Sequence, residues 1–460
     1  MEKIEKKISD DILIEALNKN CIDRNVKLKK FIEFLNMVDG NTIISLDGEW
    51  GSGKTWFVKQ ADIIINYYNN SNKEDSKLIE EKQQTEISKG GLKKISEINE
   101  FSQLKNIIEN NSINSIYFSA WEHDDEEDPI LSVVYEIIKK FPKKLQSETK
   151  IAGNNLLDIL KILVKTLSKG NIDIDNINSN HDLLEAVKQK YQTKQKIQEI
   201  FNIVIDEKCN KLVLFVDEID RCIPLYAVKM LERLKHYITD ERIVIVISTN
   251  LKELGNTIGN LYGNQETSMN YLDKFIDYRL IIPKCDMKKY YKSIYPLINK
   301  ENYWYVLTLR RTMEYKNMSL RQMNRYVDYM KLFEKNLFTS VINNNYELDE
   351  NLFLKYLIVP YMVGLFLMDH TEYVKFINGN GLEEFTRYAT SKEIKSFMLE
   401  SLDINDEEYS TTIKSIYEYI SKSDKKEPLK INSHIINQED IFTTMNYFNI
   451  LGEFSDFENE

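Results

Sequence analysis

The feature that most constrains the fold is residues 41–60, where a short β-branched run leads through a glycine-rich turn into an amphipathic segment. The turn, GEWGSGKT at 48–55, matches G-x-x-x-x-G-K-[ST] at every fixed position. Its glycines let successive backbone N–H groups converge on one anion, and the helix that follows adds the partial positive charge of its N-terminus. We therefore predict a phosphate-binding loop between a strand over 42–46 and a helix from Trp56 onward.

The loop also carries the side chains that a nucleoside triphosphate and its metal ion need. Lys54 can neutralise the β- and γ-phosphates, and the Thr55 hydroxyl can ligate Mg²⁺. The residues predicted to bind the nucleotide are Gly48, Glu49, Trp50, Gly51, Ser52, Gly53, Lys54, Thr55 and Trp56.

Five short apolar runs alternate with helical stretches in the first 283 residues. These runs are expected to be strands over 42–46, 113–118, 211–216, 242–247 and 279–282. The alternation is typical of an α/β fold in which helices flank a mainly parallel, five-stranded sheet. Ligands of such sheets bind beyond the carboxyl ends of the strands, where each candidate motif of this chain lies.

The run KLVLFV at 211–216 ends in Asp217 and Glu218, which is the usual form of a Walker B strand. Asp217 would hold Mg²⁺ through its waters, and Glu218 would orient or deprotonate the water that attacks the γ-phosphate. The alternative is a helix N-cap with an acidic first turn. A further strand separates this motif from the phosphate loop, and an inserted strand is typical of NTPases with a catalytic glutamate.

The fourth run ends in Ser248, Thr249 and Asn250. Asn250, or Thr249, lies where a polar side chain could contact the γ-phosphate, and a simple helix cap is the alternative. We include Asn250 with Lys54 and Glu218 among the candidate catalytic residues.

Composition and charge narrow the class of protein. The net charge of −11 argues against a surface that coats nucleic acid, although a local basic patch is compatible with it. The four cysteines lack metal-binding spacing and the N-terminus lacks a signal-peptide core, so we expect a cytoplasmic protein. The most apolar run, 356–368, is shorter than the roughly 20 residues that span a bilayer and is expected to be a buried helix.

Three motifs in combination resemble the KAP family of P-loop NTPases, namely GEWGSGKT at 48–55, FSAWEHDDEEDP at 118–129 and DEIDRC at 217–222. YLDKFIDYRLIIP at 271–283 and SLRQMNRY at 319–326 fit the same pattern, so the resemblance covers about residues 25–330. It implies ATP as the nucleotide and a site that other subunits or partners complete. For bacterial members it also implies a part in defence against phage or mobile elements.

The chain departs from the family in two places. Many members carry transmembrane helices within the NTPase domain, and this sequence has no apolar run long enough for one. Leu320 stands where the family has a proline before the first arginine of its Arg-x-x-x-Arg helix. Two features are each open to two interpretations. Trp121 is either a packing residue or a functional one. Asp220 and Arg221 either form a local ion pair or signal the nucleotide state.

The NTPase core is expected over 1–283, with a polar, solvated insertion at 69–111 that is partly helical or mobile, and a helical insertion at 143–210. Residues 284–335 are expected to form a basic helical lid, since they contain twelve Lys and Arg against five Asp and Glu. Residues 336–460 are expected to be an all-helical domain for partner docking or oligomerisation.

Within the lid, Arg321 and Arg325 share one helix face and could reach the γ-phosphate of the same or a neighbouring subunit. Arg325 is the candidate nucleotide-sensing arginine. Alternatively, the lid contacts a nucleic-acid backbone, with its tyrosines stacking on bases.

We predict an ATPase switch in which Lys54, Thr55 and Asp217 bind ATP and Mg²⁺ and Glu218 drives slow hydrolysis. The lid would convert the nucleotide state into an altered surface for a homo-oligomer, a separate effector protein or both. Glu218 favours this prediction over a nucleotide-stabilised scaffold with little turnover, because a pure binder needs no base. A DNA-stimulated ATPase ranks last because the net charge is acidic.

Overall fold

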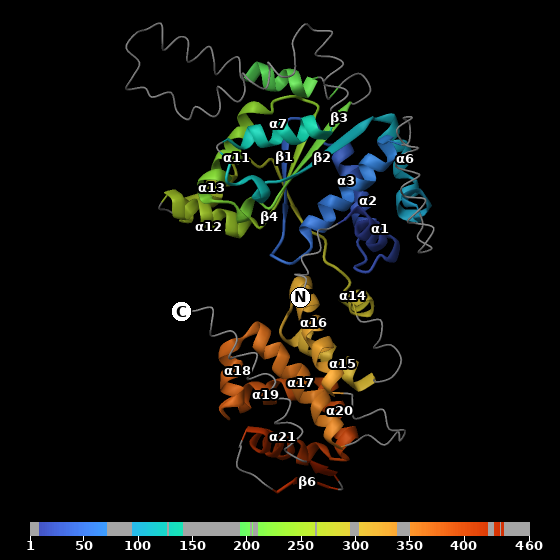
Figure 1. Cartoon of the computed structure of the whole chain (residues 1–460), viewed down its shortest axis with the longest axis vertical. Helices are drawn as coiled ribbons and strands as arrows, with labels where there is room; N and C mark the ends of the chain where they lie inside the picture. The colour runs from blue at the N-terminus through green and yellow to red at the C-terminus, as the bar shows by residue number, and fades with distance from the viewer. Residues whose placement is uncertain are drawn as a thin grey trace. The chain divides into compact units, whose positions relative to one another are not determined.

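The computed structural model describes residues 9–70, 94–126, 128–140, 194–202, 205, 210–262, 265–294, 303–337, 350–421, 427–432 and 434–436. The chain divides into two compact units, Met1–Asp286 and Met287–Glu460, which run from blue to yellow and from gold to red in Figure 1. The boundary expected after residue 283 lies close to this division. The residues predicted to form a separate lid, 284–335, belong almost entirely to the same unit as the helices that follow them.

The first unit is built on a parallel sheet of five strands in the order β2-β3-β4-β1-β5. The strands are β1 (Thr42–Asp47), β2 (Ile113–Ser119), β3 (Lys211–Asp217), β4 (Ile243–Thr249) and β5 (Tyr278–Ile281). The predicted α/β class is therefore confirmed, with strand ends shifted by one or two residues. In the sheet, β4 lies between β1 and β3, whereas β2, which separates the two motifs along the chain, lies at the edge.

Helices cover both faces of this sheet, which is why the central strands β3 and β4 are buried along nearly their whole length rather than alternating. One face carries α7 (Pro129–Lys140), α11 (Pro224–Tyr237), α12 (Leu251–Tyr262) and α13 (Gln265–Leu272) (Figure 1). The other face carries α1 (Asp10–Lys19), α2 (Asn25–Met37), α3 (Lys54–Asn70), η1 (Ile95–Glu97), α5 (Asn99–Ser102) and α6 (Leu104–Asn110). Successive strand residues alternate between the two cores: Ile43 packs in the first and Ile44 in the second.

Two helices precede β1, and Pro129 and Pro224 each occupy the first position of a helix, where the missing N–H costs nothing. Most of the predicted helical insertion, 143–193, lies outside the described residues.

The solvated insertion predicted at 69–111 is wrong for its second half. Phe101, Leu104 and Ile108 are fully buried in the core beside α3. Their spacing places all three on one face of a helical stretch, a pattern that the polar composition of the segment obscures. Residues 71–93 lie outside the described part of the chain.

The second unit is mostly helical in its described residues. Its helices are α14 (Met287–Ile294), α15 (Tyr303–Tyr315), α16 (Leu320–Leu337), α17 (Glu350–Met368), α18 (His370–Ile377), α19 (Leu382–Ala389), α20 (Lys392–Leu402) and α21 (Asp406–Ser421). It also contains two short antiparallel strands, β6 (Leu429–Ile431) and β7 (His434–Ile436), in a region expected to be all-helical.

The apolar run expected to be a buried helix forms most of α17. Residues 357–365 are buried, and the hydroxyl of Tyr326 donates a hydrogen bond at 2.9 Å to the carbonyl of Pro360 within this helix. Among the described helices, none combines the length and apolarity that crossing a bilayer requires.

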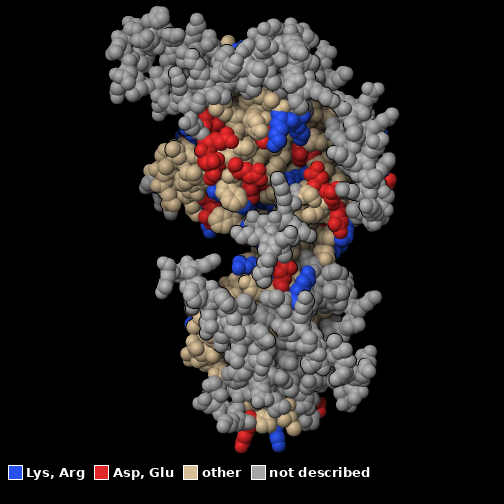
Figure 2. All heavy atoms as spheres, viewed as in Figure 1, with Lys and Arg blue, Asp and Glu red and all other residues tan. Residues whose placement is uncertain are grey.

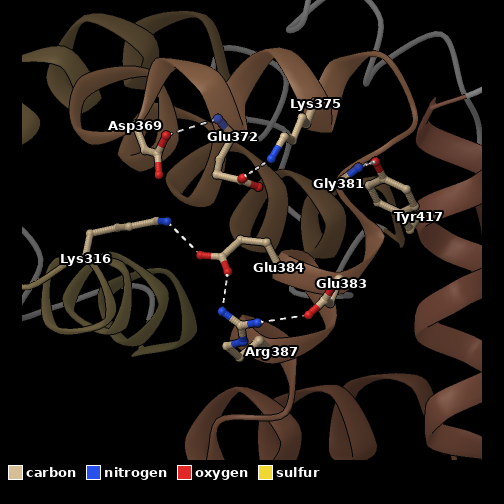
Figure 3. Close-up of polar contacts among 9 residues, drawn as sticks. All are labelled: Lys316, Asp369, Glu372, Lys375, Gly381, Glu383, Glu384, Arg387 and Tyr417. Carbon is tan, nitrogen blue, oxygen red and sulfur yellow. Dashed lines mark hydrogen bonds and ion pairs between the residues drawn. The ribbon is translucent and has the colours of Figure 1, made fainter.

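Polar contacts join α21 to the start of α19, and Lys316 to α19, within the second unit (Figure 3). The Tyr417 hydroxyl accepts a hydrogen bond from the buried Gly381 N–H at 2.6 Å and donates one to the Phe376 carbonyl at 3.1 Å. Lys316 pairs with Glu384 at 2.8 Å, and Arg387 contacts the other oxygen of Glu384 at 3.0 Å.

Tyr417→Phe is expected to lower the free energy of unfolding of the second unit by about 1–3 kcal/mol, because the buried Gly381 N–H loses its acceptor. Urea denaturation of the full chain measures this change. Tyr373→Phe is the matched control, because the buried hydroxyl of Tyr373 has no hydrogen-bond partner among the described residues. Equal losses in the two variants would contradict the role given to the Tyr417 hydroxyl.

Candidate functional site

The predicted motifs meet at the carboxyl-terminal ends of the strands, because the parallel strands end in register. Asp47 at the end of β1 lies opposite Thr249 at the end of β4. Asp217 at the end of β3 lies opposite Ser248 on one side and Ser119 on the other. One site therefore lies at these strand ends. It is formed by the phosphate loop, the Walker B carboxylates and the ends of β2 and β4.

The backbone of the phosphate loop needs glycine at three positions. Gly51 and Gly53 have φ of 77° and 87°, in the left-handed region that favours glycine. A Cβ on Gly48 would lie 2.5 Å from Cγ2 of Ile282 and 2.9 Å from Oγ of Ser52. Helix α3 begins at Lys54, inside the motif and two residues before the predicted start, so its N-terminal N–H groups lie at the turn.

Lys54 lies folded against the loop, with a side chain only 9% exposed. Its Nζ donates to the carbonyls of Gly48 at 2.5 Å and Glu49 at 3.1 Å. Burial lowers the pKa of Lys54, while the charges of Asp220 and Asp217 act in the opposite direction. The ammonium group is therefore positioned to neutralise a phosphate bound in the loop.

One further atom of the loop fits a phosphate ligand. The Ser52 hydroxyl is buried and has no hydrogen-bond partner among the described residues. A buried hydroxyl without a partner is costly, and a phosphate oxygen would satisfy it. The loop thus offers a cation, an unpaired hydroxyl and converging N–H groups to the same ligand.

Asp217 and Thr55 could provide oxygen ligands for a metal ion beside the loop. Asp217 is 1% exposed, and its Oδ2 accepts a hydrogen bond from the Tyr117 hydroxyl at 3.0 Å. Burial raises the pKa of Asp217, and hydrogen bonds from the hydroxyls of Thr55 and Tyr117 oppose that rise. Mg²⁺ is commonly held by one carboxylate, a hydroxyl, waters and substrate phosphates, so this donor set fits it.

Glu218 follows in an unusual backbone conformation. Its φ of 63° and ψ of 25° place it in the left-handed region, directly before the short turn η4 (Ile219–Arg221). Its Oε1 pairs with Arg221 at 2.5 Å, and its Oε2 accepts from the Ser119 hydroxyl at 3.4 Å. Burial raises the pKa of Glu218, and the charge of Arg221 opposes that rise.

Asp220 and Arg221 have different partners, so the local ion pair between them that the sequence left open does not form. Asp220 accepts from Nε1 of Trp50 at 2.6 Å and from Oγ1 of Thr249 at 3.1 Å. It therefore joins the phosphate loop to the end of β4. Arg221 instead pairs with Glu218.

Trp121 lies in the turn η2 (Trp121–His123) at the end of β2 and is 48% exposed. The guanidinium carbon of Arg221 lies 5.4 Å from the centre of its ring, within the range of a cation–π contact. The tryptophan is thus a partner of the arginine beside Glu218, and a purely core-packing role is excluded by its exposure.

Asn250 acts as a helix cap in the structure. Its Oδ1 accepts a hydrogen bond from the backbone N–H of Glu253 at 3.3 Å, in the first turn of α12. Contact of Asn250 with a γ-phosphate stays a prediction. Arg321 and Arg325 are exposed on α16 in the second unit, and their role also stays a prediction.

Two other residues of the predicted set lie at the loop without a polar side-chain role there. Glu49 is exposed, and Trp56 is half-buried in the first turn of α3. Sequence reasoning also missed Arg24, which is 4% exposed and donates through Nη1 to the Ser52 carbonyl at 3.0 Å. A single arginine ahead of α2 carries no motif, so no local signal could have placed it beside the loop.

The sequence matches the model of a known protein family. The model of the KAP family P-loop domain matches residues 24–446, which is most of the chain. A comparison with curated proteins finds no significant match. The matched range includes the phosphate loop, the Walker B strand and the described helices of the second unit. The chain therefore belongs to the KAP family of P-loop NTPases.

Proposed function

We propose that the chain is a Mg²⁺-dependent ATPase that acts as a switch. The observation that carries this proposal is the placement of Asp217 and Glu218 at the end of β3, directly before the turn η4, which the hydrogen bond from Trp50 to Asp220 joins to the phosphate loop. A metal-binding pair beside the loop and an adjacent carboxylate are what hydrolysis requires in addition to binding. Family membership supports nucleotide binding, and it is the basis for proposing ATP.

Each side chain has a defined task in this proposal. Lys54 binds the β- and γ-phosphates, and Thr55 with Asp217 holds Mg²⁺, which supplies positive charge to the phosphates. Glu218 orients the attacking water and takes its proton through a carboxylate oxygen. Asp220 keeps the phosphate loop and the end of β4 in one arrangement through Trp50 and Thr249. Asn250 and Arg325 are proposed to sense the γ-phosphate.

We propose that nucleotide state is read out through assembly or a separate effector protein, in a bacterial defence system against phage or mobile elements. The resemblance to the KAP family supports this part of the proposal. The face of the first unit drawn in Figure 2 carries clustered acidic side chains, which disfavours nucleic acid as the partner of that face.

One observation favours a second function, a nucleotide-stabilised scaffold with little turnover. Both carboxylate oxygens of Glu218 are already engaged, by Arg221 and Ser119. A base held in this way has fewer free acceptor positions for the attacking water and less freedom to turn toward it.

Phosphate release by the purified full chain, with ATP and either Mg²⁺ or excess EDTA, tests the proposal. We expect turnover that EDTA abolishes, because the β- and γ-phosphates then lose their counter-charge. Turnover per chain that rises with protein concentration, together with a larger mass in ATP, would support a site completed between subunits. Tight ATP binding without phosphate release at any concentration would favour the scaffold.

A further inference from the structure

We propose that Arg221 is a positioning residue that restrains Glu218 and so limits the rate of ATP hydrolysis. The inference rests on the proposed ATPase function. In this proposal Arg221 controls how freely the carboxylate of Glu218 moves, and it does not affect nucleotide binding.

The ion pair between Arg221 and Glu218 is short and partly shielded from water. Nη1 of Arg221 lies 2.5 Å from Oε1 of Glu218, and the two side chains are 25% and 16% exposed. Charge pairs that are shielded in this way are screened less than surface pairs. Separating the two side chains therefore requires free energy, which adds to the barrier of each turnover.

The backbone around Glu218 limits other ways for its carboxylate to move. The Glu218 N–H donates to the Ser248 carbonyl at 3.2 Å, and its own carbonyl accepts from the Arg221 N–H at 3.1 Å. Both contacts fix the left-handed turn that starts η4. The carboxylate consequently changes partner by side-chain rotation, and rotation requires release of the guanidinium.

Trp121 makes a second contact with the same guanidinium. The ring centre lies 5.4 Å from Cζ of Arg221, so the cation contacts both an indole and a carboxylate. A guanidinium stacks on an aromatic ring and binds a carboxylate at the same time, which an ammonium group does less well. The ion pair with Glu218 and the contact with the Trp121 ring together hold the Arg221 side chain in place.

The consequence for catalysis follows from the geometry of Glu218. The guanidinium at 2.5 Å occupies one of the two acceptor positions of Oε1 and fixes the direction in which the carboxylate points, which restricts how it can hold the attacking water. Oε2 is the other acceptor, and the Ser119 hydroxyl lies 3.4 Å from it. Removing Arg221 would free Oε1 for water without removing the base.

The test is steady-state hydrolysis by the full chain carrying Arg221→Ala. We expect kcat to rise about three- to tenfold, the factor that a shielded ion pair corresponds to, with KM and the Kd for ATP unchanged. Arg221→Lys keeps the charge but loses the planar stack, so its kcat should lie between wild type and Arg221→Ala. Trp121→Ala should raise kcat in the same direction by a smaller factor.

Arg310→Ala is the matched control. Arg310 pairs with Glu314 at 2.8 Å and lies 5.9 Å from the ring centre of Tyr291, so it makes the same two kinds of contact in the second unit. Its kcat should equal that of wild type. The thermal midpoint of each variant shows that the chain is folded.

A kcat for Arg221→Ala at or below the wild-type value, in a folded variant with wild-type ATP affinity, would overturn the inference. So would equal changes in kcat and KM for all three substitutions. Absence of phosphate release from wild type and every variant, with ATP bound, would instead refute the ATPase proposal. The two failures are therefore distinguishable.

Discussion

Lys54→Ala is expected to weaken ATP binding about 10- to 100-fold and to remove turnover. Lys54 is the cation held against the loop, and a charge-assisted hydrogen bond contributes about 1.5–3 kcal/mol, which is a factor of that size in Kd. The loss is large because the ammonium is buried and already oriented by the carbonyls of Gly48 and Glu49. Isothermal titration of ATP into the full chain measures it.

A control variant separates the local effect from a general loss of positive charge. Lys19→Ala removes an exposed lysine of α1 that pairs with Glu15, and it should bind ATP as wild type does. ATP affinity that stays at the wild-type value in Lys54→Ala would contradict the assignment of the loop as the phosphate site.

Glu218→Gln is expected to lower kcat about 10²- to 10⁴-fold while ATP binding persists. Glutamine has nearly the same shape but cannot take the proton of the attacking water, and a positioned base contributes a factor of that size. Binding persists because Lys54, Thr55 and Asp217 are unchanged. Single-turnover phosphate release, beside ATP titration of the same preparation, measures both quantities.

The matched control for this variant is Glu122→Gln. Glu122 is an exposed residue of η2 at the same edge of the sheet, and its change should leave kcat within about twofold of wild type. If Glu218→Gln keeps kcat within tenfold of wild type, Glu218 is not the base that takes the proton of the attacking water.

The sequence predicted the parts of the site that depend on local chemistry. Gly51 and Gly53 have to be glycine because the loop requires positive φ, so the motif is readable without the fold. The strands before the motifs are apolar because both faces of the sheet are buried. That pattern placed Asp217 and Glu218 correctly at the end of β3.

The contacts that connect these parts could not be predicted, because they depend on segments far apart in the chain. Trp50 and Asp220 are separated by 170 residues, and Arg24 and Ser52 by 28. The order of β4 and β2 in the sheet is likewise a property of the fold. The motifs predicted which side chains lie at the carboxyl-terminal ends of the strands. Only the fold shows that Asp220 contacts Trp50 and Thr249 while Arg221 contacts Glu218.

Composition misled the interpretation of residues 94–111. Its polar average predicted solvation, yet Phe101 and Leu104 supply enough apolar surface to bury a short helical segment against α2 and α3. In the second unit, β6 and β7 have only three residues each, too few to show a strand period.

The central claim is tested most directly by measuring bound ATP and released phosphate in the same samples of wild type and Glu218→Gln, with Mg²⁺, over a series of protein concentrations. The proposed function predicts that both bind ATP and that only wild type releases phosphate at an appreciable rate. Equal phosphate release from the two proteins, or tight ATP binding with no release from wild type at any concentration, would contradict it.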